Sequence, residues 1–197
     1  SNTVRCYVNG TLTNTFNSVT QGIGSGSVAF QIGNWYTTPT YPFPGYISNL
    51  RWVKGTGLYT STFTPPTSPL TAIANTSLLT CQSYNFLDNS TNAFAITANG
   101  NVQPVTGNPF GFTTTQPVSW SAATNGGSGY FDGTGDYLSL PSSSAFAIPT
   151  STTPFTIEAW IYPTAFNGGA IFTRSTVDEN LVVSPAVVRV DRGTFRG

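Results

Sequence analysis

The chain has 197 residues and carries only seven basic and seven acidic side chains, with no histidine. Seven basic residues are too few to form a basic surface for phosphate groups. We therefore expect no nucleic acid as a partner. The absence of histidine excludes imidazole bases, His-activated nucleophiles and His metal ligands.

The charges are unevenly distributed, because half of them lie in residues 174–197. Elsewhere Thr, Ser, Asn and Gly provide solubility, which is more usual outside cells than in cytosolic enzymes. No run approaches the roughly 18 apolar residues that cross a bilayer, so we expect no membrane insertion. The sequence contains no Met, and we expect it to be a piece of a longer protein.

Short runs rich in β-branched and aromatic residues alternate with turn sequences, whereas no window keeps helical periodicity. This pattern predicts an all-β fold, an antiparallel β-sandwich. The predicted strands are residues 4–10, 27–33, 45–55, 76–83, 94–100, 129–133, 136–141, 155–163 and 169–175.

Two of these strands indicate which side chains face the core. In 45–55, strict alternation places Leu50 and Trp52 on the core face and Ile47 on the opposite face. In 155–163, alternation gives a mixed face and an aliphatic face, the latter formed by Phe155, Ile157, Ala159 and Ile161.

Turn sequences separate the predicted strands. The pairs Asn9-Gly10, Asn99-Gly100 and Asp132-Gly133 adopt positive φ at little cost and typically join antiparallel strands. Residues 63–70 are predicted to cross the surface in an extended conformation, because their prolines cannot donate to a ladder. Residues 103–129 are predicted to be a linker or long loop.

The two cysteines, Cys6 and Cys81, both lie in apolar, strand-like sequence. They could form a disulfide bond that closes a long loop. They could equally be two buried free thiols that pack as small apolar residues. The sequence leaves both alternatives open.

Two groups of motifs resemble the two halves of one known domain. Residues 129–141 (GYFDGTGDYLSLP) and 154–164 (PFTIEAWIYPT) resemble the N-terminal half of a laminin-G-like, concanavalin A-like jelly-roll module. Residues 5–15 (RCYVNGTLTNT), 30–34 (FQIGN) and 42–83 resemble its C-terminal half, so the order is inverted. The combination resembles modules found in tandem in phage virion structural proteins and tail fibres.

This resemblance implies a jelly roll and a chain that is out of register with its module. It divides the chain into the C-terminal half of a module (1–85), connecting strands and a linker (86–129), the N-terminal half of a module (130–173) and a charged tail of unclear assignment (174–197). Half a jelly roll exposes an apolar face and unpaired strand edges. The halves could pack together as one permuted sandwich, or each could be completed by a neighbouring copy.

Residues 33–45 gather aromatic side chains in a Pro-rich loop. Exposed rings stack on the faces of sugars, and neighbouring Asn and Thr side chains bind hydroxyl groups. The alternative is that the rings close one end of the sandwich. The candidate glycan-binding residues are Trp35, Tyr36, Tyr41 and Phe43.

Asp132 and Asp136 flank a Gly-Thr-Gly turn. Carboxylates are hard oxygen ligands, so the pair is a candidate calcium site, and the sequence suggests no cofactor other than Ca²⁺. The alternative is a hairpin in which both side chains cap backbone amides.

The remaining charged residues do not indicate an enzyme. Glu158 and Glu179 lie far apart in sequence, and no carboxylate cluster resembles that of a glycosidase. We expect Arg51 and Lys54 to be solvated partners of nearby carbonyl groups or of an Asp.

The sequence and the resemblance together predict a non-catalytic structural module of an extracellular or virion assembly, similar to a tail fibre. Its expected role is self-association, attachment to a surface, or both. The expected partners are further copies, in a homo-oligomer or fibre, or a cell-surface glycan. The alternative is a lectin-like domain that recognises carbohydrates on a host surface.

Overall fold

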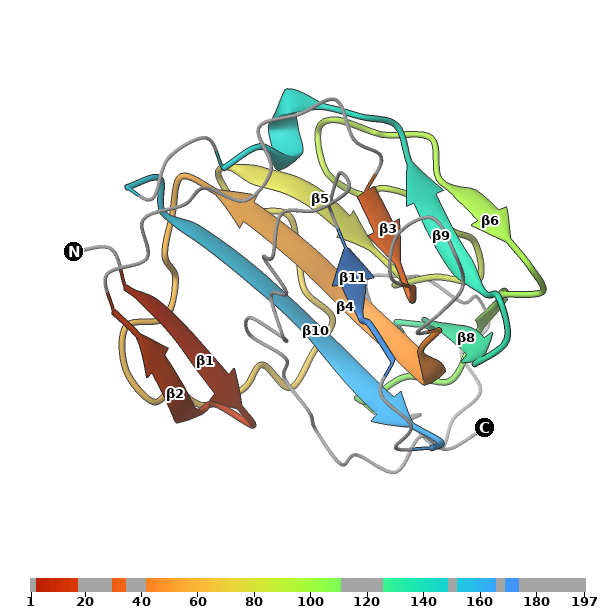
Figure 1. The fold of residues 1–197 in the computed structure, drawn as a ribbon, viewed down its shortest axis with the longest axis horizontal. Helices are drawn as coiled ribbons and strands as arrows, with labels where there is room; N and C mark the ends of the chain where they lie inside the picture. Colours follow the sequence, from red (N-terminus) through yellow and green to blue (C-terminus); the bar gives the residue numbers. More distant parts are fainter. Residues whose placement is uncertain are drawn as a thin grey trace.

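The computed structural model describes residues 3–17, 30–34, 42–110, 126–148, 152–165 and 169–173. The regular structure of these residues is β, apart from the 3₁₀ turn η1 (Ser144–Phe146). The strands form three sheets, and every pair is antiparallel (Figure 1). The predicted all-β antiparallel sandwich is therefore confirmed. Among these residues, no helix has the length and hydropathy that a membrane span requires.

The large sheet is built around one long strand, β4 (Pro44–Lys54). β10 (Phe155–Pro163) pairs along one side of β4. β8 (Ser128–Asp132) and β5 (Thr76–Thr80) share its other side, with β8 at the start of β4 and β5 at its end. The short strand β7 (Gln103–Val105) extends the sheet beyond β8.

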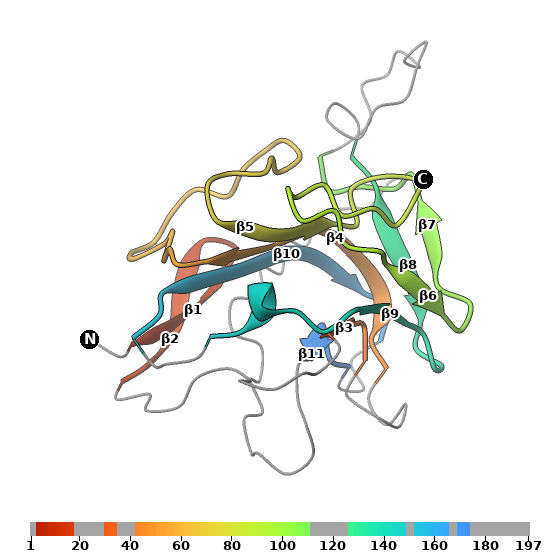
Figure 2. The ribbon, with the colours of Figure 1, turned by 90° about the horizontal axis from the view of Figure 1, so that it is seen from above.

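The small sheet has the order β11-β3-β9-β6. Its strands are β3 (Phe30–Ile32), β6 (Thr97–Asn99), β9 (Tyr137–Leu140) and β11 (Phe172–Thr173). Seen from above, the large sheet curls over the small one, and the core lies between them (Figure 2).

The core is apolar and rich in aromatic rings. The Trp52 ring of the large sheet meets the Phe30 ring of the small sheet edge to face, with centroids 5.2 Å apart. Phe146 of η1 stacks on Phe30 and closes the same cluster. Cys6 and Cys81 are both buried and free, so the structure corresponds to the alternative of two packed thiols.

A bulge in β4 decides which side chains enter the core. Asn49 has φ 53, and the β4–β10 register shifts between Glu158 and Trp160. The extra residue places Ile47 on the same face as Leu50 and Trp52, in one core cluster. The strict alternation predicted for Ile47 is therefore wrong, because a β-bulge moves the residues before it to the other face. The predicted core positions of Leu50 and Trp52 are confirmed.

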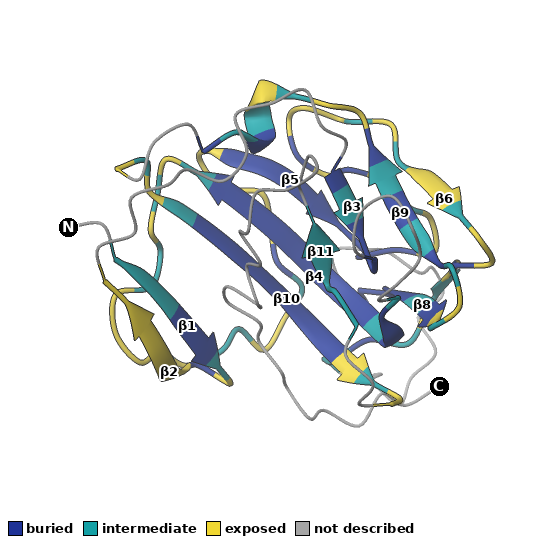
Figure 3. Ribbon diagram, viewed as in Figure 1, coloured by how far each residue is buried: buried dark blue, intermediate teal, exposed yellow. Residues whose placement is uncertain are grey.

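Both faces of the middle of the large sheet are buried (Figure 3). The inner face of β10 contributes Ile157, Ala159 and Ile161 to the core, as predicted. The outer face is covered by the segment 55–75, which has no strand. Leu70 of this segment packs with Leu79 and Trp160 in a second, small apolar cluster. The Pro-rich part of the segment makes no ladder, as predicted for residues 63–70.

Segments far apart in sequence share both sandwich sheets. β4 pairs with β8 and β10, and β3 pairs with β9 and β11. The described strands of these two parts of the chain therefore cover each other's apolar faces within one molecule. The jelly-roll topology itself stays a prediction.

The β1–β2 hairpin forms a separate sheet beside the sandwich (Figure 1). β1 (Val4–Val8) is partly buried, whereas all six residues of β2 (Thr11–Phe16) are exposed. The turn between them has positive φ at both Asn9 and Gly10, as the sequence predicts.

Candidate binding pocket

A pocket of about 200 Å³ lies between the β1–β2 hairpin, residues 57–60 and the start of β10. Its lining combines hydroxyl groups, aromatic rings and one cation, including those of Thr3, Arg5, Tyr7, Tyr59, Thr152 and Phe155. Sequence reasoning missed this site, because its walls come from three separate parts of the chain. The only local signal was an isolated charge, Arg5, two residues before Tyr7 on one strand.

The hairpin wall is fixed to the body by Tyr7 and Gly10. The buried Tyr7 hydroxyl donates to the carbonyl of Tyr59 at 3.3 Å, and its ring contacts Phe63. The amide of Phe63 donates to the carbonyl of Gly10 at 2.9 Å. A Cβ at Gly10 would lie 1.9 Å from the Phe63 carbonyl oxygen, so only glycine allows this approach.

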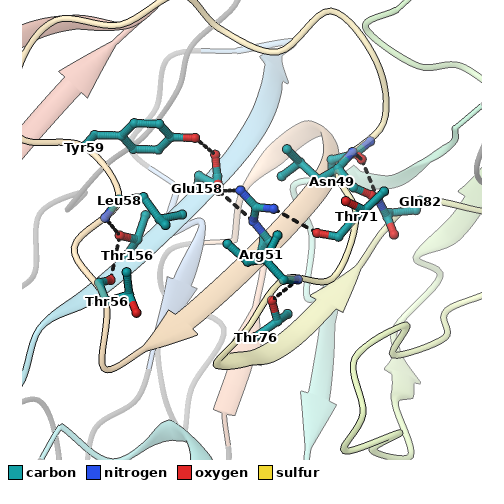
Figure 4. A network of polar contacts seen from close by, with 12 residues as sticks. Asn49, Arg51, Thr56, Leu58, Tyr59, Thr71, Thr76, Gln82, Thr156 and Glu158 are labelled. Carbon is teal, nitrogen blue, oxygen red and sulfur yellow. Dashed lines mark hydrogen bonds and ion pairs between the residues drawn. The ribbon is translucent and has the colours of Figure 1, made fainter.

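The opposite wall is held against β10 by side chains of that strand. The Leu58 amide donates to Thr156 Oγ1 at 2.9 Å, and this hydroxyl donates to the carbonyl of Thr56. The Tyr59 hydroxyl donates to Glu158 Oε2 at 2.8 Å (Figure 4). The Tyr59 ring is therefore positioned by both the hairpin and β10.

Glu158 also forms a buried ion pair with Arg51 on the neighbouring strand (Figure 4). The two side chains are 2% and 7% exposed. Arg51 Nε donates to Glu158 Oε1 at 2.8 Å, Nη2 donates to the same oxygen, and Nη1 donates to the carbonyl of Thr71. The prediction of a solvated Arg51 is wrong, because segment 55–75 excludes water from this face. Lys54 was predicted to be a solvated partner of a nearby carbonyl group, and its Nζ does donate to the carbonyl of Ser144.

The bulge residue Asn49 extends this polar network (Figure 4). Its Oδ1 accepts from the Leu70 amide at 2.8 Å and from Gln82 Nε2 at 2.6 Å. Gln82 Nε2 also donates to the carbonyl of Leu70. These bonds hold segment 55–75 on the sheet, and they satisfy polar groups that would otherwise be buried without partners.

Arg5 differs from every other charged residue in the described part of the chain. The other charged side chains all form hydrogen bonds or ion pairs with protein groups; they are Arg51, Lys54, Asp88, Asp132, Asp136 and Glu158. Arg5 forms none. Its guanidinium therefore leaves its donors to solvent or to a ligand in the pocket that it lines.

Of the predicted aromatic site, only Phe43 lies among the described residues; Trp35, Tyr36 and Tyr41 lie outside them. Phe43 is 4% exposed, and its ring packs edge to face on Phe131 with centroids 6.4 Å apart. A buried ring offers no face to a sugar. Phe43 therefore follows the second interpretation, in which a ring of this loop closes the sandwich.

The Asp132 and Asp136 carboxylates cap backbone amides and bind a side-chain amide. Asp136 is fully buried and accepts from the amides of Asn101 at 2.7 Å and Asp132 at 2.9 Å. Asp132 accepts from the Thr134 amide and from Asn101 Nδ2. All four oxygens thus have donors, as the capping alternative requires. The described residues contain no group of three or more His, Cys, Asp or Glu that could hold a metal ion.

The pocket can therefore bind a ligand through ring faces, hydroxyl groups and one guanidinium. Comparisons with models of protein families, with curated proteins and with solved structures found no match.

Proposed function

We propose that the chain is a non-catalytic β-sandwich module of an extracellular or virion assembly, and that it attaches this assembly to a surface that carries glycans. The observation that carries the proposal is the pocket between β1 and β10. The partly buried rings of Tyr59 and Phe155 and the threonines Thr3 and Thr60 line one concave site. Sugars are bound by this combination, because their apolar faces stack on rings and their hydroxyls need polar partners.

The state of the carboxylates supports a non-catalytic role. A general acid or base must exchange a proton with a ligand within hydrogen-bond reach. Glu158 lies near the pocket, but both of its oxygens are occupied by Arg51 and Tyr59. The other described carboxylates, of Asp88, Asp132 and Asp136, serve backbone amides.

A glycan array with a blocked pocket tests the proposal. Gly57 lines the pocket, its Cβ position is open and its φ is not positive, so Gly57→Trp adds a ring without backbone strain. We expect the wild-type chain to bind at least one glycan and Gly57→Trp to bind none. The control is Thr134→Trp, which adds the same ring to the exposed β8–β9 turn. An empty array, or equal binding by Gly57→Trp, would contradict the proposal.

Self-association is a second candidate role, and β2 supports it. Its outer edge pairs with no other strand of the described chain, and its Leu12 and Phe16 are 40% and 47% exposed. Exposed apolar edge strands readily add a further strand. We expect sedimentation velocity to show an oligomer that Leu12→Lys dissociates, while the control Leu87→Lys, at an exposed loop leucine, does not. A monomeric wild-type chain would contradict this role.

A further inference from the structure

The pocket between β1 and β10 contains the one charged side chain of the described residues that lacks a protein partner. We propose that this pocket binds a sugar that carries a carboxylate group, and that Arg5 binds the carboxylate. This inference rests on the proposed function and specifies the class of glycan that the module attaches to.

Arg5 is positioned to face a ligand in the pocket. It lies two residues before Tyr7 on β1, and both residues line the pocket. Tyr7 is anchored to residues 59 and 63, which fixes β1 at this wall of the pocket. Arg5 is half-buried and lines the pocket, so a bound anion would be partly shielded from water.

No described acidic group near the pocket neutralises Arg5. Glu158 accepts from Tyr59, a residue of the lining, but it forms its ion pair with Arg51. The positive charge is therefore available for an anion, and partial burial strengthens its attraction compared with open solvent. A guanidinium presents parallel N–H donors that match the two oxygens of a carboxylate.

The rest of the lining distinguishes a sugar from a simple carboxylic acid. A ring flanked by Tyr59 and Phe155 gains stacking contacts, and the threonines Thr3 and Thr60 carry hydroxyl groups for its own hydroxyls. The volume of about 200 Å³ lies below the 300–1,000 Å³ of sites for drug-sized ligands. A single acidic sugar residue, such as a uronic acid at a chain end, matches this size better than a long glycan segment.

Titrations with three small ligands, followed by amide NMR shifts, test this inference. D-Glucuronate carries the carboxylate on a sugar ring, D-glucose has the same ring without charge, and acetate has the charge without the ring. We expect saturable shifts at Thr3, Arg5, Tyr59 and Thr152 with glucuronate, and at least roughly tenfold weaker binding of glucose and acetate.

Variants assign the effect to Arg5. Arg5→Gln should weaken glucuronate binding roughly tenfold while leaving glucose binding unchanged. Arg5→Lys should retain part of the affinity, because it keeps the charge but loses the paired donors. The control Lys54→Gln removes one positive charge from a neighbouring pocket and should leave binding as in the wild type. Thermal unfolding of each variant verifies its fold.

Each contrary outcome has a defined meaning. Equal affinity for glucose and glucuronate, or an Arg5→Gln variant that binds glucuronate as tightly as the wild type, would overturn the inference and leave the proposed function standing. Acetate that binds as tightly as glucuronate would overturn the role of the sugar ring. If neither sugar shifts the pocket resonances and the glycan array is empty, both the inference and the proposed function fail.

Discussion

Arg51 on β4 and Glu158 on β10 are direct partners in the antiparallel ladder, and their side chains form an ion pair buried under segment 55–75. Removing one partner leaves a buried charge without compensation, which costs about 3–5 kcal/mol. We therefore expect Arg51→Met to lower the free energy of unfolding by this amount, measured by urea denaturation.

The double variant Arg51→Met/Glu158→Leu provides the control. We expect it to recover much of the lost stability, because replacing both members of a buried pair with apolar side chains is often neutral. A loss below about 1 kcal/mol for Arg51→Met alone would show that the pair is hydrated in solution, since exposed pairs contribute only that much.

Gly10 controls the docking of the hairpin and thereby the pocket. Gly10 has φ 75, and a Cβ there would collide with the backbone of Phe63. We expect Gly10→Ala to detach the hairpin, to speed hydrogen exchange at Tyr7 and to abolish ligand binding in the pocket. The matched control is Gly57→Ala, whose Cβ meets open space. Wild-type exchange at Tyr7 in Gly10→Ala would refute this role.

Cys81 is fully buried, so we expect its thiol to react slowly. Desolvation raises the pKa of Cys81 from 9.0 to about 12. Because the folded state keeps the proton longer than the unfolded state, stability is lost as pH rises from about 9 towards 12, at up to about 1.4 kcal/mol per pH unit. We expect Cys81→Ala to unfold with a weaker pH dependence in this range.

A thiol reagent gives a second readout. At pH 8 the reagent should modify both buried cysteines of the native wild-type chain slowly. In denaturant it should modify both cysteines rapidly, because both are free thiols that become exposed. Rapid labelling of Cys81 in the native chain would contradict its burial.

Asp136 is expected to stabilise the β8–β9 turn without calcium. Asp136→Asn places an amide group where the carboxylate accepts from the amides of Asn101 and Asp132, so we expect a loss of about 1–3 kcal/mol. The Tm of the wild-type chain should be the same in EDTA and in millimolar Ca²⁺. A rise of Tm with Ca²⁺ that disappears in Asp132→Asn would instead support the calcium hypothesis.

The sequence predicted the strands where alternation and turn residues were clear. β10 matches its predicted bounds, and its aliphatic face lies in the core. β2 (Thr11–Phe16) was missed because its threonines and asparagine resemble a loop. β7 lies at the start of the predicted linker, and its Pro104 is tolerated because, among the described strands, β7 pairs with β8 alone.

Features that depend on tertiary contacts could not be predicted. The positive φ of Asn49 breaks the alternation in β4, and nothing in the flanking residues signals it. Arg51 is buried because segment 55–75 folds over the sheet. A pattern that predicts strands does not predict where such a loop segment packs. The pocket is lined by Tyr7, Tyr59 and Phe155, whose separation in sequence hides the fact that they share one site.

The hairpin shares no ladder with either sandwich sheet in the described part of the chain, and it is fastened to the body through Tyr7 and the Gly10–Phe63 bond. Elements with few tethers detach at a lower free energy than the core around them. The residence time of a ligand in the pocket would therefore be limited by how long the hairpin stays attached to the body. A mechanical force applied at residue 3 would therefore detach the hairpin and release the ligand before it disrupted β4. The module would lose its ligand under force while the sandwich remained folded.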